Sequence, residues 1–139
     1  MDYNKCLEKN LLKKNENAKN RVNTSINTAE KFLNSARKNF EIKEFETCLI
    51  IAYNSIFHLC RALLFNKGFV ERSHFCLIIA LKHYYDQDEK LSNLLNSVDK
   101  VRLSRHEIQY RGEFTNKEEA QFVLNLTKNF KNHALKLLN

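Results

Sequence analysis

The sequence predicts an all-α protein, an up-and-down bundle of about five helices. Apolar residues recur at helical spacing along most of the chain, and no segment alternates like a strand over a useful length. The 139 residues include no proline and only two glycines, Gly68 and Gly112. Because tight turns use both residue types, their scarcity favours long helices with few connections. A chain of this length forms one domain with its own core.

The chain begins with a polar leader, residues 1–21, which is rich in Asn and Lys. We expect this leader to be helical or frayed and to lie outside the bundle. Residues 22–139 then form a single helical domain. Its first helix has one apolar stripe, because apolar side chains recur every three or four positions: Val22, Ile26, Ala29, Leu33, Ala36 and Phe40.

The second helix covers roughly residues 44–66 and is apolar on most sides, so we expect it at the centre of the bundle. Gly68 fits its C-terminal end, where a left-handed residue is common. Ser73 suits the N-cap of a third helix over residues 74–85. The polar stretch 86–90 reads as a loop.

A fourth helix is predicted from about Ser92 to Gln109 or Tyr110, and Gly112 ends it. The segment Thr115–Glu118 fits a capping box, in which a Thr hydroxyl and a Glu carboxylate bond each other's free backbone amides. The last helix follows, with an apolar stripe of its own: Phe122 or Val123, Leu126, Phe130, Ala134 and Leu137.

The four cysteines have no metal-binding spacing. Cys48, Cys60 and Cys76 stand among Leu, Ile and Phe, where a reduced cysteine behaves as a small hydrophobe. We therefore expect buried free thiols, no metal site and no cofactor.

The net charge is +7, and the basic excess lies in residues 1–40 and 101–139. Such a charge attracts polyanions, although lysines on exposed helix faces also simply keep a protein in solution. The longest apolar run is shorter than the roughly 20 residues that span a bilayer. The first 20 residues contain no apolar signal core. We expect a cytoplasmic protein without a membrane segment.

The most concentrated chemistry lies in the fourth helix. Arg102, Arg105, His106 and Gln109 share one helix face, and Tyr110 and Arg111 follow. A guanidinium beside an imidazole suits cleavage of a phosphodiester, because Arg stabilises charge on the phosphate while His transfers the proton. The alternative is a solvated basic face that complements the helix dipole.

A polar stripe on the second helix is a further candidate site. Asn54, His58 and Arg61 lie at i, i+4 and i+7 on a helix that is otherwise apolar. This stripe either lines a cleft facing the Arg105 helix across a dimer, or it meets solvent or pairs with a neighbouring carboxylate. We expect His74 to be a local capping or packing residue, and His83 and His133 to lie at the surface.

Two segments together resemble the HEPN family: Thr47–His74, TCLIIAYNSIFHLCRALLFNKGFVERSH, and Val101–Gly112, VRLSRHEIQYRG. The resemblance covers about residues 25–138 and implies a small helical bundle that forms a homodimer. The catalytic signature of the family is Arg, four to six residues, then His. Arg105 matches the Arg, but Tyr110 stands where the His would be. The chain therefore looks like the Arg-x4-Tyr subgroup, which is often paired with minimal nucleotidyltransferases in toxin–antitoxin or defence systems.

The resemblance leaves two functions open. The first is a module with a degenerate ribonuclease motif that binds nucleic acid, a nucleotide or a nucleotidyltransferase partner. Its binding residues are Arg102, Arg105, Gln109 and Arg111, with Asn54, His58 and Arg61. The second is an active metal-independent endoribonuclease that uses Arg105 with His106 or Tyr110.

Overall fold

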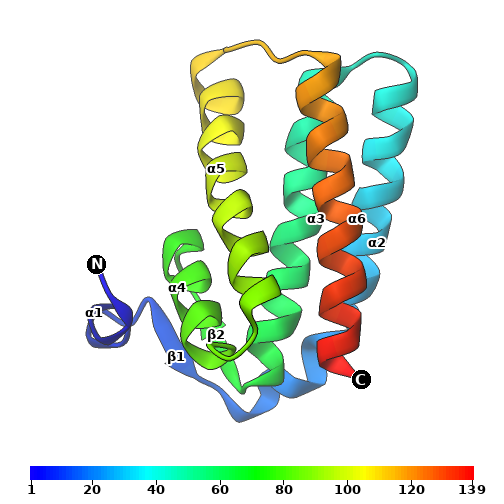
Figure 1. The fold of residues 1–139 in the computed structure, drawn as a ribbon. Helices are drawn as coiled ribbons and strands as arrows, with labels where there is room; N and C mark the ends of the chain where they lie inside the picture. The colour runs from blue at the N-terminus through cyan, green and yellow to red at the C-terminus, as the bar shows by residue number, and fades with distance from the viewer.

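A computed structural model describes all 139 residues as a bundle of long helices (Figure 1). The long helices are α2 (Val22–Glu41), α3 (Phe45–Asn66), α5 (Glu89–Arg111) and α6 (Lys117–Leu138). They run side by side along the long axis, and the shorter α4 (His74–Tyr84) packs at one end. The all-α prediction is confirmed, and each of the five predicted helices has a counterpart.

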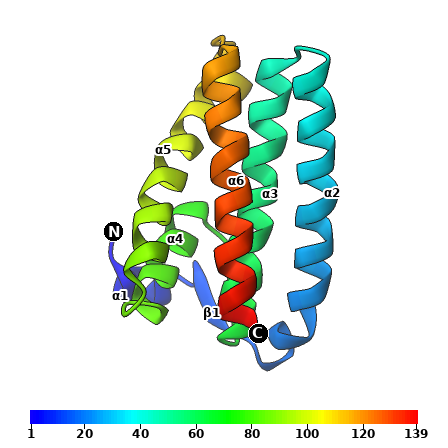
Figure 2. The same cartoon turned by 45° about the vertical axis from the view of Figure 1, so that its right-hand side comes forward.

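Helix α3 is the centre of the bundle. Figures 1 and 2 both place it between α2 and α5, and 12 of its 22 residues are buried. It is long and apolar enough to cross a membrane, but 67% of its most apolar stretch is buried inside the fold, as expected for a core helix. Its buried Ser55 hydroxyl donates to the Ala29 carbonyl of α2 at 2.7 Å.

Residues 1–21 form short elements that pack against the lower end of the bundle: α1 (Tyr3–Glu8), β1 (Leu12–Lys14) and the 3-10 helix η1 (Glu16–Arg21). Strand β1 pairs antiparallel with β2 (Phe69–Glu71), which joins α3 to α4. The sequence predicts neither strand, because three residues are too few to show alternation.

The leader contributes to the core rather than only touching it. Cys6, Leu12 and Ala18 are each almost completely buried, and Cys6 forms a disulfide with Cys76 of α4. The expectation of a free thiol at Cys76 was therefore wrong, because the two partners are 70 residues apart and nothing local to either marks the pairing. Cys48 and Cys60 are buried free cysteines, as expected.

The helix ends differ slightly from the prediction. Helix α5 begins three residues earlier than expected, because the Asp88 carboxylate accepts the Leu91 N–H at 2.8 Å. It ends at Gly112, which adopts φ +69°.

The cap of α6 is displaced by one residue from the predicted box. Asn116, not Thr115, is the N-cap, and its side chain accepts the Glu119 N–H at 2.8 Å. Thr115 instead donates its hydroxyl to the Glu119 carboxylate.

Candidate functional site

A basic pocket of about 450 Å³ opens between α4 and α5. Helix α5 supplies Arg102, Arg105, His106 and Tyr110 to its lining, and His74 comes from the first turn of α4. Arg102, Arg105 and His106 share one side of the helix because of their spacing, as the sequence predicted, whereas Gln109 of the predicted face is not part of the lining and Tyr110 is. No carboxylate lines the pocket.

Arg105 lies in this pocket and has no acidic partner. Its guanidinium lies 4.8 Å from the centre of the Tyr53 ring, and its Nη1 donates to the Gln109 amide oxygen at 3.1 Å. The Nε atom is buried and has no hydrogen-bond partner. A buried donor that lacks an acceptor costs free energy until a ligand supplies one.

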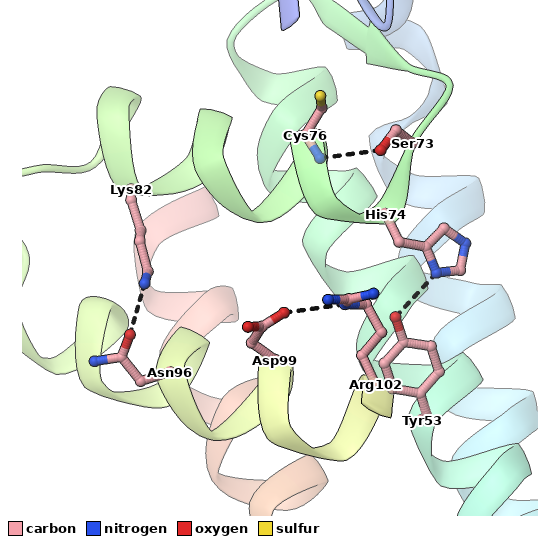
Figure 3. A network of polar contacts seen from close by, with 8 residues as sticks. All are labelled: Tyr53, Ser73, His74, Cys76, Lys82, Asn96, Asp99 and Arg102. Carbon is pink, nitrogen blue, oxygen red and sulfur yellow. Dashed lines mark hydrogen bonds and ion pairs between the residues drawn. The ribbon is translucent and has the colours of Figure 1, made fainter. Parts of the chain in front are cut away.

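Arg102 is partly neutralised. Its Nε donates to Asp99, one turn earlier on α5, at 3.0 Å (Figure 3). Its guanidinium also lies 5.8 Å from the ring centre of Phe75, next to His74 in the sequence.

His106 and Tyr110 form the exposed side of the pocket. Their ring centres are 5.0 Å apart, and Tyr110 is 63% exposed. A phenol hydroxyl is a poor proton acceptor near neutral pH. Arg111, whose side chain is also largely exposed, lies 3.7 Å from Glu107 and is not part of the pocket lining.

His74 is the pocket residue that sequence reasoning missed as a site residue. Its Nδ1 lies 3.0 Å from the Tyr53 hydroxyl (Figure 3), and its ring stacks on Phe57 with the centres 4.1 Å apart. Burial, followed by the charges of Arg105, Arg102 and Arg61, lowers the pKa of His74 to about 4. The imidazole is therefore neutral at physiological pH.

The predicted polar stripe of α3 lies outside this pocket. His58 stacks on Phe32 of α2 with ring centres 5.5 Å apart, and burial, then the Arg61 charge, lowers its pKa. Arg61 pairs with the buried Glu71 of β2 at 3.1 Å. Asn54 is half-buried one turn before His58. The structure thus brings four α5 candidates into one pocket, leaves Gln109 and Arg111 out of its lining, and engages His58 and Arg61 in contacts elsewhere on α3.

No group of three or more His, Cys, Asp or Glu side chains is arranged to hold a metal ion. The chemistry available in the pocket is that of guanidinium and imidazole groups acting on an anion.

Comparison with known proteins agrees with this fold. A family model described as the HEPN domain matches residues 22–137, and the chain belongs to that family. No match is found among the curated proteins compared with it. Family membership supports a role that involves nucleic acid.

Proposed function

We propose that this chain is a HEPN module that binds RNA through the pocket between α4 and α5 and has a degenerate ribonuclease motif. The observation that carries this proposal is Arg105, a guanidinium without a carboxylate partner in a pocket that no carboxylate lines. Guanidinium groups bind phosphate oxygens with two parallel hydrogen bonds. Arg102 and Gln109 support the same contact, and the surplus of positive charge attracts the polyanion.

A degenerate motif is favoured because Tyr110 occupies the position of the histidine that transfers protons in the family. An active endoribonuclease is the second candidate, and one observation favours it: His106 lines the pocket beside Arg105. In that case Arg105 stabilises charge on the phosphate, and His106 or Tyr110 transfers the proton.

The test measures binding and cleavage of a structured RNA in the presence of a chelator, with Arg105→Ala, His106→Ala and Tyr110→Ala. We expect binding that weakens steeply with salt, is largely lost in Arg105→Ala, and is not accompanied by cleavage. Arg37→Ala is the matched control, because Arg37 is a half-buried arginine of α2 that does not line the pocket. Robust cleavage that disappears in Arg105→Ala and in one of the other two variants would establish the enzyme instead.

The proposal includes a homodimer. Three large apolar side chains are exposed on α5, on the α5–α6 connection and on α6: Leu103, Phe114 and Phe122. Phe114 is 88% exposed, and soluble chains rarely leave contiguous apolar surface uncovered. We propose this region as the dimer interface. The apolar side chains of α3 are not available for this role, because α2, α5 and α6 largely cover them.

Sedimentation tests the dimer. We expect a dimer at tens of micromolar protein, in roughly the range where weak assemblies form, and a monomer for Phe114→Asp. Ile42→Asp, an exposed apolar position at the end of α2, is the control that should stay dimeric. A monomeric wild-type chain would contradict the proposal.

A nucleotidyltransferase partner and a toxin–antitoxin or defence role in the cytoplasm complete the proposal. The partner and the role follow from the resemblance to the HEPN subgroup with the Arg-x4-Tyr pattern, here Arg105 and Tyr110. The gene next to this one provides the quickest test: a minimal nucleotidyltransferase there, co-purifying with this chain, is the expected result.

A further inference from the structure

His74 sits where three helices meet around the basic pocket. It is the first residue of α4, its ring lies on Phe57 of α3, and it lines the same pocket as the α5 arginines. Tyr53 of α3 lies beneath both: its ring faces the Arg105 guanidinium and its hydroxyl faces His74 Nδ1. The histidine and the unpaired arginine are therefore held by the same buried phenol.

The charges that act on His74 are those of arginines, two of which are paired with carboxylates farther away: Arg102 with Asp99 and Arg61 with Glu71. Arg61 and Tyr53 face His74 from α3, and Arg102, Arg105, His106 and Tyr110 line the pocket with it from α5. A positive charge on the His74 imidazole is therefore unfavourable, in agreement with the lowered pKa of His74. A neutral imidazole has one N–H and one nitrogen lone pair.

Tyr53 determines which ring nitrogen carries that hydrogen. Burial raises the pKa of Tyr53 to about 12, so its hydroxyl keeps its proton. The charges of Arg105 and Arg102 oppose this rise but do not outweigh burial. The buried phenol proton then needs an acceptor, and His74 Nδ1 is the partner within reach. With Nδ1 accepting, the hydrogen of the neutral ring is on Nε2.

We propose that His74 binds phosphate in this pocket together with Arg105, as an uncharged hydrogen-bond donor that Tyr53 fixes in the Nε2–H tautomer. Tyr53 is the positioning residue of the pair. The proposal rests on the proposed function, because it assigns a second contact to the same phosphate site. It also separates this histidine from proton transfer, since an imidazole held neutral among arginines is a weak base.

The tautomer is tested without any ligand. Nitrogen-15 NMR of the histidine rings at pH 6 to 8 should show His74 with a protonated Nε2 and an unprotonated Nδ1, and with no titration over that range. Tyr53→Phe should return the ring to a mixture of tautomers while the protein remains folded by circular dichroism. A His74 ring protonated on Nδ1, or one that titrates between pH 6 and 8, would overturn the proposal.

The ligand contact is tested by titration with inorganic phosphate and with a short single-stranded oligouridylate. His74→Ala should weaken binding of both by about tenfold, the effect of one lost hydrogen bond to a charged group. His74→Gln, whose amide N–H lies near the position of Nε2, should recover part of the loss. His83→Ala is the matched control, because His83 is on the same helix and stacks on Tyr3 outside the pocket.

The outcomes separate the two proposals. If neither the wild type nor any variant binds phosphate or RNA, the proposed function fails together with this inference. If binding is present and is lost in Arg105→Ala but unchanged in His74→Ala, the function stands and the role of His74 is wrong. If His74→Ala and Tyr53→Phe weaken binding while His83→Ala does not, both are supported.

Discussion

His133 Nε2 lies 2.9 Å from both carboxylate oxygens of Asp88, and this contact joins the last turns of α6 to the beginning of α5. Asp88 also caps α5 through the Leu91 N–H. His133 had been expected at the surface, but its side chain is only 13% exposed. That expectation was wrong because the partner lies 45 residues away and no local pattern reveals it.

The Asp88 contact predicts a pH-dependent stability. Burial opposes ionisation of Asp88, but the Leu91 N–H and His133 outweigh it, so the pKa of Asp88 lies below its usual 3.8. A folded-state pKa below the unfolded value stabilises the protein above the unfolded pKa, and this stabilisation is lost as pH falls through the folded pKa. Thermal melts should show Asp88→Asn less stable than wild type at pH 5 to 7, with the difference shrinking as pH falls below the usual pKa of 3.8.

Asp88→Ala is the companion variant for this experiment. Asn still caps a helix, whereas Ala does not, so Asp88→Ala should lose about 1 kcal/mol more than Asp88→Asn at every pH. Equal stabilities of the wild type and Asp88→Asn at pH 6 would show that the negative charge of Asp88 contributes nothing.

The Cys6–Cys76 disulfide should stabilise the oxidised protein. Cross-links that close long loops restrict the unfolded chain, so reduction should lower the free energy of unfolding by about 2–4 kcal/mol. Denaturant unfolding with and without reductant measures the effect. The double variant Cys6→Ser/Cys76→Ser should be less stable than the oxidised wild type both with and without reductant. A change in the stability of this variant on adding reductant would contradict the assignment of the effect to the Cys6–Cys76 disulfide.

Helix α3 should be the most sensitive to loss of side-chain volume. Leu63 and Ile56 are completely buried, so replacing either with Ala should cost about 2–5 kcal/mol in denaturant unfolding. Ile42→Ala, at a position at the end of α2 that is 68% exposed, should change stability by less than about 0.5 kcal/mol. Losses below about 1 kcal/mol at both α3 positions would mean that this helix is not the core.

Tyr110→His should restore the spacing of the family's catalytic signature, Arg105 followed by four residues and His. The side chain at this position is mostly exposed, so the exchange costs little stability. We expect cleavage of a fluorescent RNA in the presence of chelator, and its loss when Arg105→Ala is added. If the folded Tyr110→His variant does not cleave RNA, the tyrosine at position 110 is not the only feature that prevents cleavage.

The helices could be predicted from the sequence because periodicity and caps are local properties. The stripe of α2 and the apolar content of α3 identified both elements, and the spacing of Arg102, Arg105 and His106 placed them on one side of α5. The first turn of α5 was assigned to a loop because Asp88, its cap, lies within a polar stretch. Local sequence therefore determined the elements but left their ends uncertain.

The rest of the site depends on contacts between distant segments. His74 reaches the pocket only because α4 packs its first turn against Tyr53 and Phe57 of α3. The sequence places Arg61 on the polar stripe of α3, but the pairing of Arg61 with Glu71 depends on the path of β2. No spacing in the sequence contains this information, because each contact joins residues that separate elements bring together.

The pairing of β1 with β2 also determines the order in which the chain assembles. Leu12 aligns with Glu71, so the first strand has no partner until the whole of α2 and α3 has been synthesised. Contacts between residues so far apart form late, because a long loop must close first. We therefore expect the helical hairpin of α2 and α3 to form before β1 pairs with β2, so residues 1–14 leave the ribosome early but are among the last to fold.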